Sequence, residues 1–458
     1  MVHLFTCIIG MSLLLDENDI SAPLRIVTNT KDALQRLTLR NDMGRVLSHA
    51  LKTCPNLRTL ALEDQLQYAE EELYMPPSPL PAGPFPLKHL HIRCGYTTLN
   101  MIDLIQKSPH LESFHLFYDD EALEHQFDDL FRLIYYELSE LRSLRVAQSA
   151  CNLFQLYPYA TKEFNTPRHM SQPGLCDLVI SGNHLHAASE KIDLLIRKSK
   201  MTLERLDLER HAYVEEIYNT MVSTGMAALT VLNCGPMDDR QDVLLSSVIK
   251  ACPMLQKVYI PPNTVSDSVL AALGQLQRLE NISLSMEGDN ITAPGVKRFM
   301  TSTATLQYFE VSISKHDSVT LQELVQCVLA CPSMRILYIS YDQWQKKSAD
   351  MTSLKESMQR SGIRKVCFSG RNQALPLLKS WTHLKELQEI VIEEAPSFLE
   401  VVDNTMISDQ DMKSFVKDRP GLSLIHVQSV KKRVCRVNLN GIPTIKETLV
   451  PGLKLFPM

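Results

Sequence analysis

The most regular feature of the chain is a phrase with three apolar positions: an apolar residue, two others, a second apolar residue, one other, and a third apolar residue. Leu57, Leu60 and Leu62 form one copy. The second and third apolar residues are two apart, so on a β-strand they point to the same face. The phrase therefore predicts a short strand with one buried face. The residues between its apolar positions point to the opposite face.

The phrase recurs along most of the chain, at a mean spacing of about 28 residues, which falls in the range of leucine-rich repeats. We identify fifteen copies, whose first apolar residues are Leu34, Leu57, Leu87, Leu111, Leu141, Leu175, Leu203, Leu229, Leu255, Leu279, Leu306, Met334, Ile363, Leu387 and Leu422. The copies at Leu175 and Leu229 fit the phrase least well. One such strand cannot bury its apolar face alone, so neighbouring copies are expected to stack into a continuous core.

Amphipathic stretches lie between the copies. Met43, Val46, Leu47, Ala50 and Leu51 have the spacing of one helix face. Each repeat is therefore expected to run strand, loop, helix, loop. The predicted fold class is an α/β leucine-rich-repeat solenoid, with a curved parallel β-sheet on its concave face and helices on its convex face.

A second phrase marks the expected ends of several helices. It reads Cys-Pro-x-Leu at Cys54 and Cys252, and Cys-Pro-x-Met at Cys331. Proline cannot continue a helix, and it biases the preceding residue towards extended geometry. The small cysteine side chain is expected to lie beneath the resulting turn.

Helix, Cys-Pro-x-Leu and then x-x-Leu-x-Leu together resemble the cysteine-containing repeats of F-box/leucine-rich-repeat proteins of the ribonuclease-inhibitor-like type, especially the fungal ones. The resemblance covers about residues 34–428. In that family an F-box binds a Skp-type adaptor of a cullin ubiquitin ligase, and the repeats hold the substrate. Residues 1–40 contain neither the Leu-Pro opening nor the tryptophan of an F-box, because the only tryptophans are Trp344 and Trp381. The resemblance thus implies an adaptor and cullin only if an F-box exists elsewhere.

The repeats also suggest a domain organisation. We expect an N-terminal capping segment at residues 1–33, the solenoid at 34–428, and a C-terminal cap or tail at 429–458. Proline-rich insertions at 64–86 and 148–174 are expected to be surface loops. The apolar run from Leu4 to Leu15 is open to two interpretations, a signal peptide or a buried strand or helix that caps the first repeat.

Charge and cysteine content limit the kinds of partner and the cellular compartment that we expect. The formal net charge is −5 on 458 residues, which gives no reason to expect nucleic acid or a membrane surface as a partner. The 11 cysteines are dispersed, which favours a reducing compartment and hence a cytoplasmic or nuclear location. No apolar run in the sequence reaches the ~18 residues of a membrane-spanning helix.

Catalytic motifs are absent from the sequence. It contains no phosphate-binding glycine loop, no His-Glu-x-x-His, no nucleophile elbow and no Cys-x-x-Cys. Cys327 and Cys331 are four apart, but the Cys-Pro turn already explains one of them. We therefore expect no enzyme activity, no cofactor and no metal site.

Function is then expected on the polar face of the strands, at the third, fifth and seventh positions of each phrase. There the sequence places a basic cluster with histidines, then acidic residues, then tyrosines. The candidate partner-binding residues are His89, His91, His115, Arg145, Asp207, Tyr259, Tyr308, Tyr338 and Tyr341. Neighbouring strands lie ~4.8 Å apart, so His91 and His115 are expected side by side. A solvated polar face and ordinary cross-strand packing are the alternative interpretations.

The sequence thus predicts a non-enzymatic scaffold that binds a protein ligand on its concave face. A sequence of basic, acidic and aromatic groups suits a protein better than nucleic acid, which favours one continuous basic stripe. Two alternatives stay open. One is a secreted or surface binding protein, tied to Leu4–Leu15, and the other is a small-GTPase regulator of similar architecture.

Overall fold

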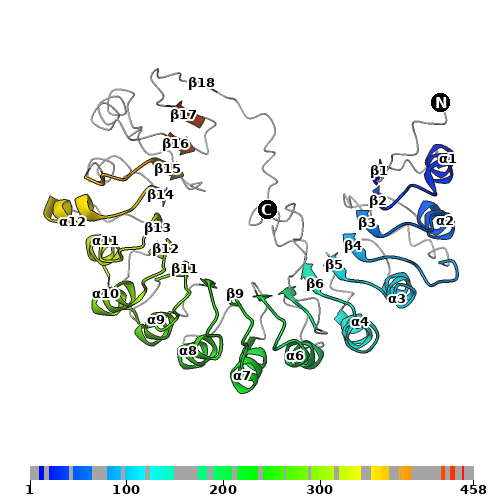
Figure 1. The fold of residues 1–458 in the computed structure, drawn as a ribbon, viewed down its shortest axis with the longest axis horizontal. Helices are drawn as coiled ribbons and strands as arrows, with labels where there is room; N and C mark the ends of the chain where they lie inside the picture. The colour runs from blue at the N-terminus through cyan, green and yellow to red at the C-terminus, as the bar shows by residue number, and fades with distance from the viewer. Residues whose placement is uncertain are drawn as a thin grey trace. The chain divides into compact units, whose positions relative to one another are not determined.

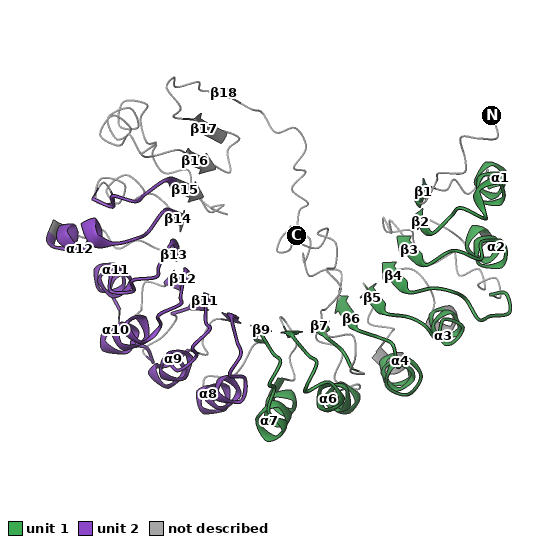
Figure 2. Cartoon of the chain, viewed as in Figure 1, with its two compact units in different colours: residues 1–236 green, residues 237–458 purple. Residues whose placement is uncertain are grey.

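Parallel strands alternate with helices along the chain in the computed structural model (Figure 1). The structure describes residues 10–14, 20–40, 45–63, 80–93, 98–118, 124–148, 174–182, 189–208, 214–235, 241–261, 265–286, 290–313, 319–341, 352–370, 381, 383–393, 424–428, 434–438 and 446–447. The chain divides into two compact units, Met1–Pro236 and Met237–Met458 (Figure 2). Each is described by itself.

Unit 1 alternates strands and helices from its first described residues. Its strands are β1 (Gly10–Leu14), β2 (Arg36–Arg40), β3 (Thr59–Glu63), β4 (His89–Arg93), β5 (Ser113–Tyr118), β6 (Ser143–Gln148), β7 (Asp177–Ser181), β8 (Arg205–Asp207) and β9 (Val231–Asn233). Its helices are α1 (Ser21–Thr30), α2 (Arg45–Thr53), α3 (Thr98–Gln106), α4 (Glu124–Glu137), α6 (Ser189–Lys198) and α7 (Val214–Thr224). Each strand pairs in parallel with the next, from β1 to β9.

Unit 2 repeats the same alternation. Its strands are β10 (Lys257–Ile260), β11 (Asn281–Ser285), β12 (Tyr308–Ile313), β13 (Ile336–Tyr341), β14 (Lys365–Gly370), β15 (Glu389–Glu393), β16 (Leu424–Gln428), β17 (Val434–Asn438) and β18 (Lys446–Glu447). Its helices are α8 (Asp242–Ala251), α9 (Asp267–Leu273), α10 (Ala293–Ser302), α11 (Leu321–Leu329), the 3-10 turn η4 (Thr352–Leu354) and α12 (Lys355–Arg360). Pairing is parallel from β10 to β16 and antiparallel from β16 to β18.

The three apolar positions of the phrase form the core of each unit. In the copy at Leu57, all three side chains are no more than 1% exposed, and the weak copies at Leu175 and Leu229 are buried equally well. The carbonyl at the second position of a phrase accepts two hydrogen bonds from the next copy. Gln35, for example, accepts from the amides of Arg58 and Thr59 at 2.9 and 3.0 Å. Burial and this repeated hydrogen bonding confirm the predicted α/β leucine-rich-repeat solenoid.

The Cys-Pro turns also form as predicted. Cys54, Cys252 and Cys331 are at most 2% exposed. The Cys331 thiol lies 3.7 Å from the carbonyl of Thr303 and 3.8 Å from that of Leu306, both in the preceding repeat. A small side chain with a weak S–H donor therefore satisfies carbonyls that the turn leaves buried.

The structure adds detail at the start of the first repeat and at the end of the first insertion. Strand β1 pairs with β2, so a strand precedes the copy at Leu34 and includes part of the Leu4–Leu15 run. At the end of the first insertion Leu80 and Phe85 are buried, so this stretch contacts unit 1 rather than extending into solvent. Residues 64–79, 149–173 and Leu422 lie outside the described residues, whereas the strand of the copy at Leu422 forms as β16. The domain boundaries at 33 and 428 stay predictions.

Candidate functional site

The sheet of each unit has one face towards the helices and one face away from them (Figure 1). We call the second the inner face. Strand register aligns the fifth positions of successive phrases into one row across it. In unit 1 this row is Thr38, Ala61, His91, His115, Arg145, Val179, Asp207 and Asn233.

His91 and His115 lie side by side, as predicted. Their ring centroids are 6.1 Å apart with the rings at 74°, and the ring of Phe117 lies 5.2 Å from that of His91. The Nε2 atom of His115 is 3.2 Å from the Ser113 hydroxyl and 3.3 Å from the Ser143 hydroxyl. The rings therefore belong to a packed row in which serines orient His115.

Burial keeps these histidines uncharged. It lowers the pKa of His115 well below the ordinary value, and the nearby Arg145 guanidinium lowers it further. The pKa of His91 is lowered chiefly by burial, against an opposing effect of Glu63. Burial also lowers the pKa of His89 at the third position of β4, and Glu112 partly offsets it. The predicted basic cluster thus contributes neutral rings at neutral pH.

The basic and acidic residues of unit 1 pair with one another. Arg145 donates to Asp177 Oδ2 at 2.9 Å from Nε, and Asp177 Oδ1 lies 3.6 Å from Arg205 Nε. Arg205 in turn donates to Asp207 Oδ2 at 3.1 Å. Arg145, Asp177, Arg205 and Asp207 therefore form one chain of alternating charges, which we call the ion-pair row. Neighbouring strands thus bring into contact the basic and acidic residues that the sequence places in succession along the face.

Asp207 differs most from the sequence-based expectation. Its side chain is 1% exposed, so it is not on a solvated surface. Cys234 is fully buried near it, with its thiol pKa raised to about 12, chiefly by burial. The hydroxyl of buried Tyr218 accepts a hydrogen bond from the Gly235 amide at 3.1 Å. Asp207 thus anchors the ion-pair row to the core of unit 1.

Serine, histidine and aspartate meet in this row, but their order differs from that of a catalytic triad. Ser143 donates its hydroxyl proton to Asp177 Oδ2 at 2.9 Å, and His115 lies on the other side of the same hydroxyl. A triad needs the histidine between the carboxylate and the serine, so that the ring can take the serine proton. Ser143 is also only 5% exposed. The geometry favours a structural role for these groups.

The inner face of unit 2 carries the predicted tyrosines. Its fifth-position row includes Tyr259, Ser283, Glu310, Tyr338 and Cys367. Tyr259 is 36% exposed. Tyr308, two residues before Glu310 on β12, donates its hydroxyl to Glu310 Oε2 at 3.0 Å.

That hydrogen bond and the surroundings raise the pKa of Tyr308, with burial as the largest cause and Glu310 as the next. Tyr308 is therefore a neutral hydrogen-bond donor at any physiological pH. Tyr341 is the last residue of β13, and its side chain lies outside the described part. Register thus brings three of the four predicted tyrosines onto a common face.

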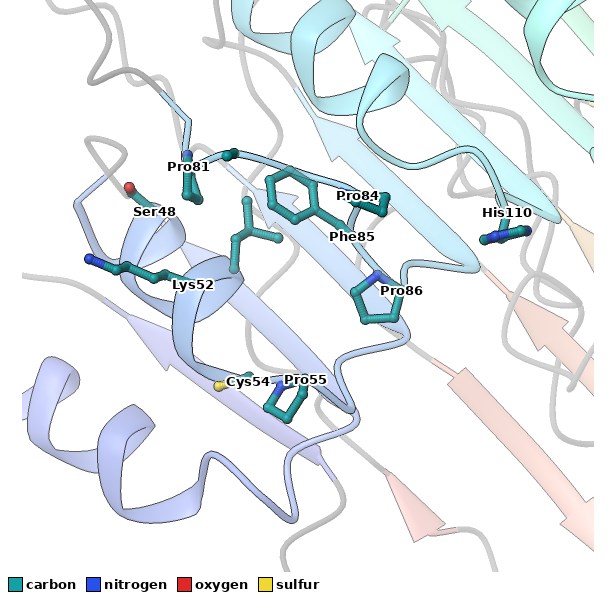
Figure 3. A pocket seen from close by; sticks show the side chains of 11 residues that line it. Ser48, Lys52, Cys54, Pro55, Pro81, Pro84, Phe85, Pro86 and His110 are labelled. Atoms are coloured by element: carbon teal, nitrogen blue, oxygen red, sulfur yellow. The ribbon is translucent and has the colours of Figure 1, made fainter.

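Unit 1 also has a hollow that was not predicted from the sequence (Figure 3). It has a volume of about 920 Å³. Its lining residues are Ser48, Leu51, Lys52, Cys54, Pro55, Pro81, Ala82, Pro84, Phe85, Pro86 and His110. His110 is held 3.1 Å from Glu140, and burial raises the pKa of the Cys54 thiol. In the sequence, only the run of prolines after residue 75 points to this hollow. Its lining residues do not include a paired acid and base.

No group of three or more histidine, cysteine, aspartate or glutamate side chains that could hold a metal ion occurs among the described residues. In the same part of the chain, no helix has both the length and the apolar character needed to cross a membrane.

Similarity to known proteins is found among solved structures only. No protein-family model and no curated protein matches the chain. Among solved structures, the chain is similar to one from the complex of Rad7 and Elc1 in yeast, over 70% of this chain and 79% of that chain. The TM-score is 0.39 and the sequence identity 16%.

Proposed function

We propose that this protein is a non-enzymatic interaction scaffold that binds a protein ligand on the inner face of its strands. The observation that carries the proposal is the ion-pair row of unit 1. It holds charged side chains in fixed positions on paired strands, and Asp177 contacts both arginines. Groups fixed before binding lose little conformational entropy on contact with a partner, which is what a recognition surface needs.

The composition of the inner faces supports a protein rather than a nucleic acid as the ligand. The arginines of the ion-pair row are already neutralised by aspartates, so they offer no continuous basic stripe. Unit 2 adds tyrosines, which bring large contact area with a polar tip. Paired charges and tyrosines are typical of protein interfaces.

A finer assignment follows the resemblance of the repeats to F-box receptors. We propose that the inner face holds a substrate protein, as the repeats do in that family. A Skp-type adaptor and a cullin join this assignment only if the full protein carries an F-box. Cys54, Cys176, Cys234, Cys252, Cys327, Cys331 and Cys367 are free thiols, which supports a cytoplasmic or nuclear location.

The proposal is tested by affinity capture with variants that differ only in where an arginine is added. Ala61 of β3 and Ser283 of β11 are half-buried, inner-face residues with small side chains. Met201 and Val243 are exposed elsewhere, at 58% and 68%. Ala61→Arg with Ser283→Arg is expected to abolish capture of the ligand, whereas Met201→Arg with Val243→Arg retains it. Capture that is unaffected by the inner-face variant, or lost with both, contradicts the proposal.

Adaptor binding is a separate outcome of the same experiment. Recovery of a Skp-type adaptor and a cullin with every variant supports the ligase assignment, because those proteins bind outside the repeats in that family. Their absence from all samples removes the ligase assignment and leaves the scaffold.

A further inference from the structure

Glu310 of unit 2 is a half-buried carboxylate without a cationic partner among the described residues. Its Oε2 atom accepts a hydrogen bond from the hydroxyl of Tyr308 at 3.0 Å. Other inner-face carboxylates have partners: Asp177 pairs with arginines, and Glu389 pairs with Lys365 at 3.0 Å. A carboxylate that is held on a sheet and that no described residue neutralises is available for a cation from outside.

Tyrosines surround this carboxylate on the inner face. Tyr338 on β13 is directly in register with Glu310. Tyr308 is on the same strand, and its pKa is raised chiefly by burial, then by Glu310, with a smaller contribution from Tyr259. We call Tyr259, Tyr308, Glu310 and Tyr338 the Tyr–Glu surface. Aromatic ring faces attract cations, most strongly where water is partly excluded.

The spacing of the strands leaves room for a flat group. Ser283 is the residue between Tyr259 and Glu310 in the row. Two strand spacings separate those residues by about 10 Å, and the short serine side chain fills little of that gap. The position-seven row beside it is also small, with Ser312 and Ser340 in register.

The other charges on this face leave Glu310 exposed to an external cation. Lys365 is held by Glu389. Lys257 is at the third position of β10, in register with Asn281 and then Tyr308, and it makes no ion pair with Glu310. The centre of the Tyr–Glu surface therefore has a negative charge between aromatic rings.

We propose that the Tyr–Glu surface binds an arginine side chain of the protein ligand, which deepens the function proposed above and rests on it. A guanidinium is planar, so it can stack on tyrosine while its N–H groups donate to Glu310. With one Glu310 oxygen bonded to Tyr308, the other oxygen is the acceptor for the arginine. Lysine lacks the planar group and is expected to bind less tightly.

The test uses defined peptides and the full chain. Blocked Gly-Arg-Gly, Gly-Lys-Gly and Gly-citrulline-Gly are titrated into protein labelled with fluorotyrosine and followed by fluorine NMR. Citrulline has the shape of arginine without its charge. The arginine peptide is expected to give saturable shifts, and the citrulline peptide to bind at least about tenfold more weakly, the loss typical of a charge-assisted hydrogen bond.

Two variants make the test specific. Glu310→Gln keeps the acceptor for Tyr308 and removes the charge, and it is expected to weaken arginine binding by at least about tenfold. Glu389→Gln removes an inner-face carboxylate that is already paired, and binding is expected to change less than about twofold. Unchanged thermal midpoints verify that both variants are folded.

Several results would overturn this inference. They are lysine or citrulline binding as tight as arginine, arginine binding unaffected by Glu310→Gln, or no saturable shift with any peptide. Each leaves the capture experiment with Ala61→Arg and Ser283→Arg intact, so failure of the arginine site and failure of the scaffold function are distinguishable.

Discussion

At the residue scale, Asp177 holds together the polar side chains on the inner face of unit 1. Its carboxylate contacts Arg145 and Arg205 and accepts the Ser143 hydroxyl. Its side chain is 13% exposed and that of Arg145 17% exposed. A partly buried carboxylate between two arginines neutralises charges that would otherwise be desolvated without a partner.

Replacement of this carboxylate is therefore expected to be costly. Asp177→Asn keeps an acceptor for Ser143 but leaves both arginines without a countercharge, and should lower the free energy of unfolding by about 3 kcal/mol. Urea denaturation measures it. The control is Glu140→Gln, which removes the exposed pair with His110 and should cost less than about 0.5 kcal/mol. Equal costs for the two variants would refute this role of Asp177.

The inner-face histidines predict a pH dependence of stability. The pKa values of His89, His91 and His115 are lowered in the folded chain, so below about pH 6.5 the unfolded chain binds more protons than the folded one. The free energy of unfolding should fall as pH decreases from 7.5 to 5.5. His115→Gln should make that dependence shallower. Urea midpoints at each pH measure both, and a slope in His115→Gln as steep as in the unmodified chain argues against this explanation.

The sequence predicts apolar positions better than charged ones. Burial of Leu175 and Leu229 follows from the phrase itself, because an apolar side chain needs only the right face of a strand. The state of Asp207 depends on which residue lies opposite on the next strand and on the depth of the row. Neither quantity is contained in a single phrase, so its burial and its pairing with Arg205 emerge only from the register.

At the element scale, helix ends are set by short local signals. Helix α11 begins with a capping box, in which the Thr320 hydroxyl accepts from the Glu323 amide and the Glu323 carboxylate accepts from the Thr320 amide at 2.9 Å. Both interactions satisfy amides that the first helical turn leaves without partners. Local signals of this kind, like the Cys-Pro turns, are readable from sequence.

Removal of the cap gives an element-scale prediction. Thr320→Ala should destabilise unit 2 by about 1 kcal/mol, whereas Thr320→Ser keeps the hydroxyl and should stay close to the unmodified chain. Amide hydrogen exchange in the first turn of α11 locates the effect. Faster exchange in both variants, or in neither, would contradict the capping role.

The end of the first insertion makes contacts that the sequence did not predict. Its prolines indicate a surface loop, yet the Phe85 amide donates to the Lys107 carbonyl and the Phe85 side chain is buried. Proline content reports that a segment is neither helix nor central strand. It carries no information on whether an apolar residue within the segment finds a place against the neighbouring repeat.

At the scale of the whole molecule, a fixed period specifies the architecture. The copies from Leu34 to Met334 all bury the same three positions, so the fold class follows from the repeat alone. The candidate site does not follow in the same way. The period places His89, His91, Tyr259 and Tyr308 on one face of their strands, but identical periods present different side chains, and recognition depends on those.

Binding of a protein ligand on the inner faces is tested most directly by site-specific photocrosslinking to the captured ligand. A photoreactive phenylalanine analogue replaces His89 or Tyr259 on the inner faces, and Met201 or Val243 away from them. We expect the inner-face positions to crosslink to the ligand protein and the other two not to do so. Crosslinks from Met201 or Val243, with none from His89 and Tyr259, would contradict it.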